Sequence, residues 1–198
     1  MCIPDTLTTP RLLLRSFSPD DAPSVQKLAD DICIAAGVLE IPHPYMLEDA
    51  REWIGEHNSL WQRGEQYIFA ITERETTALI GAASLRVNGT HAHAELGYWI
   101  GEAFRGKRYA TEAAEALLEF GFLGLGLHRI YGRLLAWNTA SSNVLTRIGM
   151  RYEGTMRGHA WKWGSFHDVH FFGIQSPDFY RRYVERSAGV IHRKGERN

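Results

Sequence analysis

A short basic turn carries the residues in this sequence that are best suited to chemistry. Arg105, Gly106, Lys107 and Arg108 bring three cations and a glycine together. The residues before them alternate in polarity as in a strand, and apolar residues from Ala110 onward recur at helical spacing. The start of a helix offers unpaired N–H groups and the positive end of the helix dipole, both of which attract phosphate. The sequence therefore predicts a phosphate-bearing ligand on this turn.

The same segment resembles a known family. Arg105-x-x-x-x-Ala110 is similar to the acyl-CoA-binding signature Arg/Gln-x-x-Gly-x-Gly/Ala of the GNAT acetyltransferase superfamily. Further blocks from Leu125 to Ile130 and from Trp137 to Met150 look like the next two blocks of that family, and of its Rim-type branch of ribosomal-protein N-terminal acetyltransferases. The likeness runs from about Arg11 to Gln175 and so covers most of the chain.

One residue departs from the signature. The family's central glycine is Arg108 here. Glycine adopts positive φ without a steric penalty, whereas an arginine at such a φ pays one. The arginine keeps its backbone N–H and adds a cation, so the CoA site is retained and the local geometry of the turn is left open.

The resemblance implies a mixed α/β (α+β) fold of about seven mostly antiparallel strands, splayed in the centre, with helices on both faces. We expect a single acyltransferase domain over residues 1–198, with its core at about 11–175 and a C-terminal helix and basic tail at 176–198. The polarity patterns predict strands at Arg11–Phe17, Gln66–Thr72, Leu79–Val87, around Glu95, at Arg129–Ala136, Met150–Trp163 and Phe166–Gln175. They predict one helix from Ser18 to Gly37, others at Leu47–Trp61, after the basic turn and after Asn138, a two-residue hairpin at Asn88–Gly89, and a short final helix at Pro177.

By the same resemblance, the chain binds acetyl-CoA as a co-substrate. The strand before the basic turn is expected to pair its backbone N–H groups with the pantetheine arm and to polarise the acetyl carbonyl. The residues that the resemblance assigns to this site are Tyr98, Trp99, Ile100, Arg105, Gly106, Lys107, Arg108, Tyr109, Ala110, Thr111, Asn138 and Arg147. A second interpretation of Trp99 is core packing.

Acetyl transfer to an amine requires removal of a proton, because the acceptor is mostly protonated at neutral pH. Glu95 is the expected base, either directly or through a water molecule. The alternative is a strand glutamate that only faces solvent. Many GNAT proteins place a tyrosine acid where this chain has Leu145, and the Rim-type branch implies Ser141 as the acid instead. The alternative for Ser141 is a serine that satisfies a backbone N–H in the first turn of a helix.

The remaining features limit the class of protein. The net charge is −1, so we expect neither a nucleic-acid nor a membrane partner, although basic residues crowd the tail from Arg181 onward. Two cysteines, Cys2 and Cys33, suit a reducing cytoplasm. Pairs at His91/His93 and His167/His170 lack further ligands at metal spacing, so no metal is expected.

The acceptor is left open by the sequence. It is a protein N-terminus or a small amine such as an antibiotic or a polyamine, and a non-catalytic CoA-binding regulator is the remaining alternative. The segment from Pro42 to Tyr45 is expected to wall the acceptor site by resemblance. The aromatic hairpin from Trp161 to Phe172 leaves open a homodimer.

Overall fold

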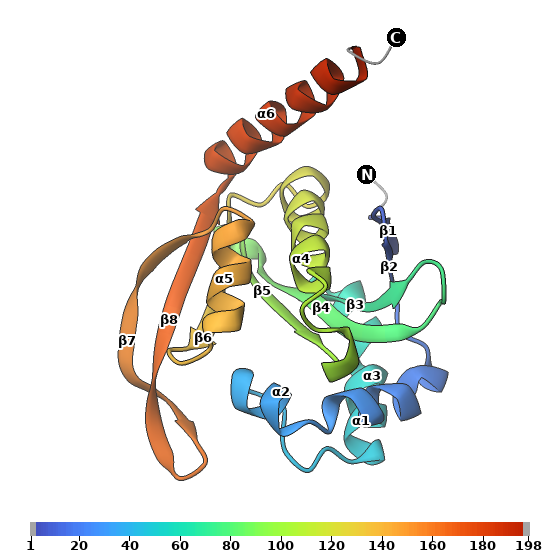
Figure 1. Cartoon of the computed structure of the whole chain (residues 1–198). Coiled ribbons are helices and arrows are strands. Elements are labelled where there is room, and N and C mark those ends of the chain that lie inside the picture. The colour runs from blue at the N-terminus through green and yellow to red at the C-terminus, as the bar shows by residue number, and fades with distance from the viewer. Residues whose placement is uncertain (1–2, 196–198) are drawn as a thin grey trace.

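A mixed sheet of eight strands forms the centre of the molecule (Figure 1). The structure is a computed structural model that describes residues 3–195, with side chains up to Glu185. In chain order the strands are β1 (Thr6–Thr8), β2 (Leu12–Arg15), β3 (Gln66–Glu73), β4 (Leu79–Asn88), β5 (His93–Ile100), β6 (Arg129–Leu135), β7 (Arg151–Lys162) and β8 (Ser165–Gln175). Their order in the sheet is β1-β2-β3-β4-β5-β6-β8-β7, and only the β5–β6 pair is parallel. The expected fold class is confirmed, with β1 as an additional edge strand.

Helices cover both faces of this sheet (Figure 1). The helices are α1 (Ala22–Ala29), α2 (Ile32–Gly37), α3 (Leu47–Gln62), α4 (Tyr109–Glu119), α5 (Thr139–Arg147) and α6 (Ser176–Gly195). The first three lie on one face, whereas α4 and α5 lie on the other. A π-helical turn at Phe120–Gly124 ends α4.

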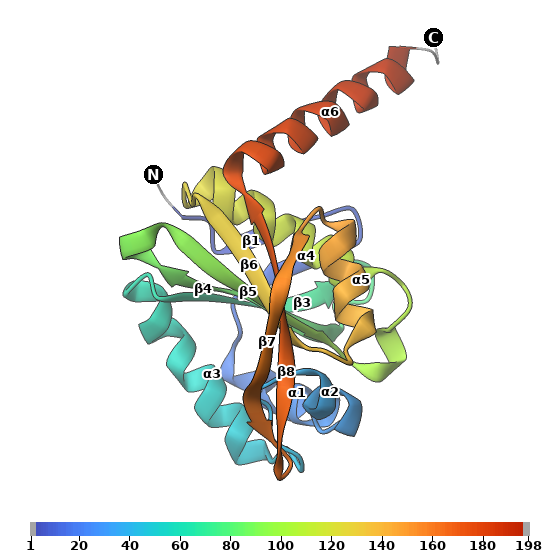
Figure 2. The same ribbon diagram turned by 90° about the vertical axis from the view of Figure 1, so that its left-hand side faces the viewer.

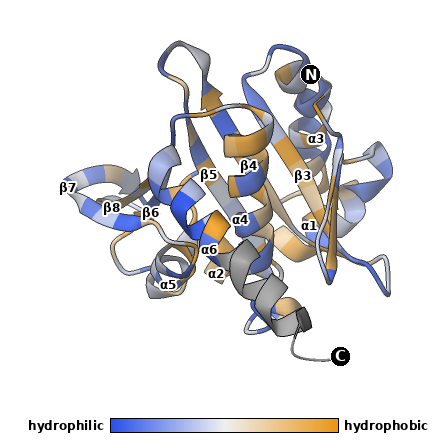
Figure 3. Cartoon of the chain, turned by 90° about the horizontal axis from the view of Figure 1, so that it is seen from above, coloured by the Kyte–Doolittle hydropathy of each residue, from blue (hydrophilic) through white to orange (hydrophobic). Residues whose placement is uncertain are grey.

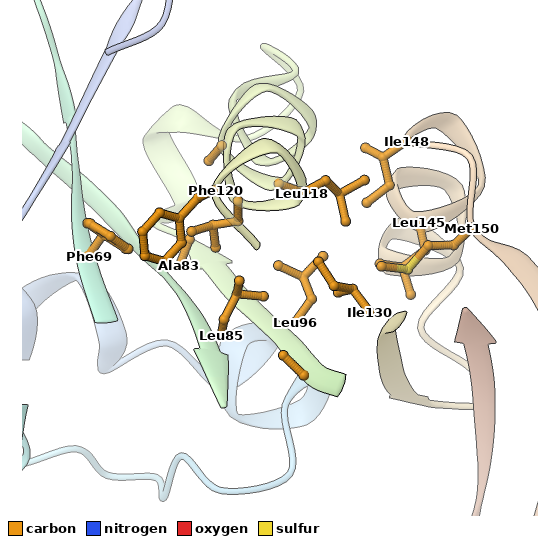
Figure 4. Close-up of a cluster of buried hydrophobic side chains, with 14 of the residues drawn as sticks. Phe69, Ala83, Leu85, Leu96, Leu118, Phe120, Ile130, Leu145, Ile148 and Met150 are labelled. Atoms are coloured by element: carbon orange, nitrogen blue, oxygen red, sulfur yellow. The ribbon is translucent and has the colours of Figure 1, made fainter. Parts of the chain in front are cut away.

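Each face of the sheet has its own hydrophobic core. The larger core packs α4 and α5 on the sheet, with Phe69, Leu96 and Leu145 among its members (Figure 4). The smaller core joins α1 and α3 to the opposite face through Trp99 and Ile54. Strand β3 is buried on both faces from Tyr67 to Thr72, and its apolar residues appear in orange in Figure 3. A strand covered on both sides has a continuous apolar sequence in place of an alternating one.

The first helix differs from its prediction, because the expected helix from Ser18 to Gly37 is interrupted. A 3-10 turn at Pro19–Asp21 leads into α1, which ends at Ala29, and α2 starts afresh at Ile32. Asp31 is the N-cap of α2, and its carboxylate accepts a hydrogen bond from the Cys33 N–H at 2.7 Å. The apolar stripe continues across the break, so periodicity alone did not reveal it.

Two other predictions of local structure were wrong. The Asn88–Gly89 turn is longer than two residues, because Asn88 Oδ1 accepts from the His91 N–H and stabilises a 3-10 turn at Gly89–His91. The final helix, expected to be short, is the 20-residue α6, which extends away from the sheet (Figure 1). Side chains from Arg186 onward, and all of Arg197, lie outside the described part, so the basic tail is not described.

The β7–β8 hairpin curves toward the end of the molecule that carries α1 and α2 (Figure 2). Near its tip Lys162 is buried, and its ammonium donates to the backbone oxygen of Val38 at 2.9 Å. Burial lowers the pKa of Lys162. Trp161, Trp163 and Phe166 are exposed there by 63%, 58% and 69%. The hairpin therefore contacts the loop after α2 and presents an apolar tip to solvent.

Candidate active site

Strands β5 and β6 separate soon after they begin to pair. Their parallel register covers only His93 to Glu95 of β5, whereas β4 remains paired with β5 as far as Ile100. The Gly101 N–H donates to Ile80 O on the β4 side, and peptide groups alternate along a strand, so those of Tyr98 and Ile100 face the gap toward β6. The peptide group of Trp99 faces β4 instead.

A cleft of about 520 Å³ occupies this gap and continues under the loop after α2. Strand β5 contributes Glu95 and Tyr98 to its lining, β6 contributes Arg133, and α5 contributes Ser141. The loop from Val38 to Pro42 and the side chain of Tyr45 close another side. The structure thus brings both expected catalytic residues to one cavity, together with Pro42 and Tyr45 of the expected acceptor wall.

Glu95 lies inside the cleft and is ion-paired. Arg133 Nε donates to Glu95 Oε1 at 2.8 Å, and the two side chains are only 19% and 23% exposed. A second pair, Arg86 with Glu40 at 2.8 Å, lies beside the first, because Arg86 is directly opposite Glu95 in the β4–β5 register. Arg133 therefore holds one oxygen of Glu95 in a fixed position. The other oxygen is available to an amine or to a water molecule.

Ser141 forms a short chain of hydroxyl groups with Tyr98. The Tyr98 hydroxyl lies 3.0 Å from Ser141 Oγ and 3.3 Å from the Ser141 backbone oxygen. Burial raises the pKa of Tyr98 far above its usual value, while the hydrogen bond with Ser141 opposes that shift. The phenol is therefore a neutral hydrogen-bond donor at any physiological pH. The Ser141 hydroxyl is oriented by a neighbour that never loses its proton.

The start of α5 contacts the end of α2, directly before the acceptor loop, which is the segment from Val38 to Pro42 that lines the cleft. Asn138 is the N-cap of α5, and its side-chain oxygen accepts from the Ser141 N–H at 3.0 Å. Its amide nitrogen donates to Gly37 O at 3.0 Å.

Leu145 is buried and lines the cleft at the position where the resemblance would have a tyrosine. Trp99 is only 9% exposed and packs in the core beneath α1 and α3.

The basic turn lies beyond the end of β5 and is exposed from Arg105 to Arg108. It does not line the cleft itself. Helix α4 begins directly after it, and no side chain caps the first N–H groups of this helix. Tyr109, Ala110 and Thr111 form its first turn, in which N–H groups have no acceptor within the helix.

Side chains from two other segments of the chain, Asp31 and Arg11, stabilise the shape of this turn. Arg105 donates to Ile100 O at 3.1 Å and forms an ion pair with Asp31, so its guanidinium links the turn to the start of α2. Arg11 donates to Lys107 O at 3.0 Å. The Lys107 ammonium lies 5.4 Å from the centre of the Phe104 ring. Of the expected phosphate ligands, Lys107 and Arg108 carry the exposed cations of the turn, and Arg147 is exposed on the last turn of α5.

Arg108 has left-handed backbone dihedrals, with φ of 65° and ψ of 18°. The turn therefore requires the conformation that glycine would adopt freely. We expect Arg108→Gly to be about 1 kcal/mol more stable than Arg108→Ala, because both lose the guanidinium and only glycine relieves the Cβ contact. Urea unfolding midpoints of the two variants measure this difference. An alanine variant that is equally stable or more stable would contradict it.

Glu112 anchors the N-terminal segment to α4. Its carboxylate accepts from Thr9 Oγ1 at 2.6 Å and from Arg11 Nε at 2.7 Å. Burial alone would raise the pKa of Glu112, but the hydrogen bonds from Thr9 and Arg11 outweigh it and hold the pKa below its usual value.

Because the pKa of Glu112 is lower in the folded state, its stabilising effect is complete above the unfolded pKa of about 4.3 and is lost as the pH falls through the folded value. We expect Glu112→Gln to lower the free energy of unfolding by about 2 kcal/mol at neutral pH, and by much less near pH 3. Denaturant titrations at several pH values measure both quantities. Glu75→Gln, in an exposed turn, is the control and should show no such dependence.

A match to the family described as "Acetyltransferase (GNAT) domain" covers residues 11–151. The chain belongs to the GNAT acetyltransferase family. The matched residues include the basic turn, both strands of the splay and the whole of α5. The expected family and enzyme class are therefore confirmed, and the chain is an N-acetyltransferase.

Several GNAT relatives are similar over most of their length. An uncharacterized N-acetyltransferase p20 of Bacillus licheniformis is 29% identical over 88% of this chain and 98% of that protein. The ribosomal protein uS5-alanine N-acetyltransferase of Shigella flexneri is 26% identical over 87% of this chain and 92% of that protein. Among solved structures, RimJ of Mycobacterium smegmatis, in complex with CoA-disulfide, superposes with a TM-score of 0.80 at 22% identity, over 88% of this chain and 89% of that one.

The sequence missed several residues of this GNAT site. Arg133 was not singled out, although an arginine in the middle of a largely apolar strand such as β6 indicates an internal partner. Asp31 and Arg11 were also missed as supports of the basic turn. Among the side chains that the structure describes, residues 3–185, no group of three or more metal-ligating residues occurs. No helix in the described range is long and apolar enough to cross a membrane.

Proposed function

We propose that this enzyme transfers an acetyl group from acetyl-CoA to a primary amine, by direct attack within a ternary complex. The observation that carries the proposal is the cleft between the separated strands β5 and β6. It brings the Glu95 carboxylate, the Ser141 hydroxyl and the gap-facing peptide groups of Tyr98 to one cavity. The uncapped start of α4 lies beyond the open end of the same strand.

The residues of the donor side fit the chemical groups of CoA. The free N–H groups at the start of α4, with Lys107 and Arg108, suit a diphosphate. The peptide groups of Tyr98 and the Ile100 N–H suit the amides of a pantetheine arm, and an N–H group there would polarise a thioester carbonyl. Arg105 supports the turn through its links to Ile100 O and Asp31. RimJ, which shares the fold, was solved in complex with CoA-disulfide.

In this mechanism Glu95 accepts the proton that the acceptor ammonium must lose, directly or through a water molecule. The free amine attacks the carbonyl carbon, a C–N bond forms and the C–S bond breaks. Ser141 supplies a proton to the departing sulfur and recovers one from the product nitrogen by way of solvent. Tyr98 orients the Ser141 hydroxyl through the 3.0 Å contact.

The proposal also covers the class of the acceptor amine and the oligomeric state of the enzyme. The Shigella relative is named for acetylation of a ribosomal-protein alanine, which makes a protein N-terminus one acceptor class, and a small amine is the other. A homodimer through the exposed tip at Trp161 and Phe166, and a cytoplasmic location, stay predictions.

A thiol-release assay tests the activity. Purified protein, acetyl-CoA and a panel of N-terminal peptides and small amines should release free CoA at a rate that depends on the amine. Mass spectrometry of the product should show one added acetyl group. Release of thiol that does not depend on any amine would contradict acetyl transfer to an amine.

A further inference from the structure

Helix α3 presents a row of carboxylates to the cleft. Asp49, Glu52 and Glu56 lie three and four residues apart, so they share one face of the helix, and all three line the cavity. The sequence pattern predicted this helix but not that its carboxylates reach the cavity. The sheet and the loop after α2 face this side of the helix, which makes it one wall of the acceptor cavity.

The positive charges of the cleft do not neutralise this row. Among the described residues, the cations that line the cleft are Arg86 and Arg133, and each is already paired, with Glu40 and Glu95 respectively. Glu52 and Glu56 form no hydrogen bond or ion pair in this part of the chain, and Glu56 has a coulombic interaction with Arg63, which does not line the cleft. One oxygen of Asp49 caps α3 by accepting from the Met46 N–H at 2.7 Å, and its other oxygen has no such contact. The cleft therefore carries an excess of negative charge along α3.

Tyr45 provides an independent indication of a ligand at the same place. The residue is 6% exposed and lines the cleft, yet its hydroxyl has no hydrogen-bond partner in the described part of the chain. Burial and, second, the charge of Asp49 raise the pKa of Tyr45 to about 12, so the hydroxyl is neutral and lies within the field of that carboxylate. Because Tyr45 lines the cleft, a ligand there can supply the hydrogen bond that the described residues do not give its hydroxyl.

An aromatic ring completes the wall. Trp53 lies on α3 between Glu52 and Glu56 in sequence, is half-buried and lines the cleft. Ammonium groups bind favourably to the faces of indole rings, and they donate hydrogen bonds to carboxylates and hydroxyls. An anion would be repelled here, and a neutral group would leave Tyr45 and the carboxylates without a partner.

We propose that the preferred acceptor is an amine that carries a second positive charge, which binds between the α3 carboxylates, Trp53 and the Tyr45 hydroxyl. This inference rests on the proposed acetyl transfer to amines and specifies its substrate class. The reacting amine lies near Glu95, and the second cation lies on the α3 side of the same cavity. The shared chemistry is found both in small diamines and in peptides with a basic residue near the N-terminus.

Three amines of equal chain length test the charge preference. Hexamethylenediamine, hexylamine and ε-aminocaproate end in a cation, a methyl group and an anion. We expect kcat/KM to fall in that order, with about tenfold between the diamine and hexylamine at low salt, because several carboxylates act on one cation. The preference should shrink at high salt. Equal rates for the three amines would reject the site for small amines, and equal rates for the two peptides described below as well would overturn the inference. Both outcomes leave the proposed function intact.

Charge-neutral variants locate the effect. Glu52→Gln combined with Glu56→Gln should reduce the preference for the diamine to about threefold or less. Glu48→Gln removes a charge from the same helix at a residue that does not line the cleft, and should retain the full preference. A preference that survives in the double variant would overturn the assignment to α3.

Measurements of diamine binding test the second-cation site even when no acetyl transfer is observed. Calorimetry with hexamethylenediamine should show weaker binding to the double variant and to Tyr45→Phe than to the wild-type protein. Equal binding by all of these proteins would overturn the inference, even if no acetyl transfer occurs with any amine.

Peptides identify the source of the second cation. Two tetrapeptides, Ser-Lys-Ala-Ala and Ser-Glu-Ala-Ala, differ in one charge, and we expect the lysine peptide to be the better acceptor. A preference in the peptides and none in the small amines would assign the site to polypeptide N-termini. A preference confined to the diamine would assign it to small polycations, and no preference in either set would reject the second-cation site.

Discussion

Replacing Glu95 by glutamine should lower kcat at least tenfold, because general-base catalysis contributes about that much or more. Glutamine keeps the size of the side chain and still accepts a hydrogen bond from Arg133, so the β5–β6 contact at 2.8 Å is retained. Only the negative charge and the proton acceptor are lost. Initial rates of thiol release between about pH 6 and 9 measure the effect.

The matched control for this variant is a second ion pair that involves an arginine of β6. Glu153 forms an ion pair with Arg129 of β6 outside the cleft, so Glu153→Gln removes a comparable pair without touching the cavity. Its kcat should stay near the wild-type value. Normal turnover of the Glu95 variant across the pH range would remove Glu95 from the mechanism, and an equal loss in both variants would indicate a structural effect.

Reversing the two exposed charges of the basic turn should have the largest effect on donor binding. We expect Lys107→Glu combined with Arg108→Glu to weaken acetyl-CoA binding at least tenfold at low salt, because two attractive charges beside the start of α4 become repulsive. The salt dependence of binding should flatten, since fewer cations contact phosphate. Calorimetry at two salt concentrations gives both quantities.

A control with the same change in net charge is available on the opposite side of the molecule. Arg151 and Arg181 lie near Asp178 and are 76% and 66% exposed, far along the chain from the turn. Changing both to glutamate should leave acetyl-CoA affinity unchanged. If the double variant of the turn also binds normally, the phosphate site lies elsewhere.

Hydrogen bonds and ion pairs connect the proposed acetyl-CoA side of the cleft with the acceptor side. Asp31 at the start of α2 pairs with Arg105 of the basic turn, and Gly37 at its end accepts from Asn138. Helix α2 is thus attached at both ends to the donor side. The acceptor loop that follows it is attached to β4 through Glu40 and to β7 through Lys162. The wall of the acceptor cavity is therefore positioned by residues from three other elements.

Local sequence patterns predicted the strands and helices well where no individual side-chain contact interrupts the element. The basic turn, α4, the β7–β8 hairpin and the cap at Asn138 all lie where periodicity and turn residues placed them. The errors occurred where a side chain contact overrides the pattern. Asp31 starts a new helix inside a continuous apolar stripe, and Asn88 stabilises a longer turn than its Asn-Gly pair indicates.

The backbone of the turn illustrates the same limit. The sequence showed an arginine in place of the glycine of the family signature, but it gave no dihedral angles. The structure shows that Arg108 adopts φ of 65°, so this position has kept the conformation of a glycine and gained a cation.

The sequence by itself determined the order of strand, basic turn and helix, the family and the class of reaction, because these depend on residues that are close together along the chain. Tertiary structure alone decided that Arg133 holds Glu95, that Arg105 pairs with Asp31 and that α3 turns its carboxylates toward the cavity. Each of these contacts joins segments separated by dozens of residues. Their geometry depends on strand order, on register and on the separation of β5 from β6, none of which is encoded in a local pattern.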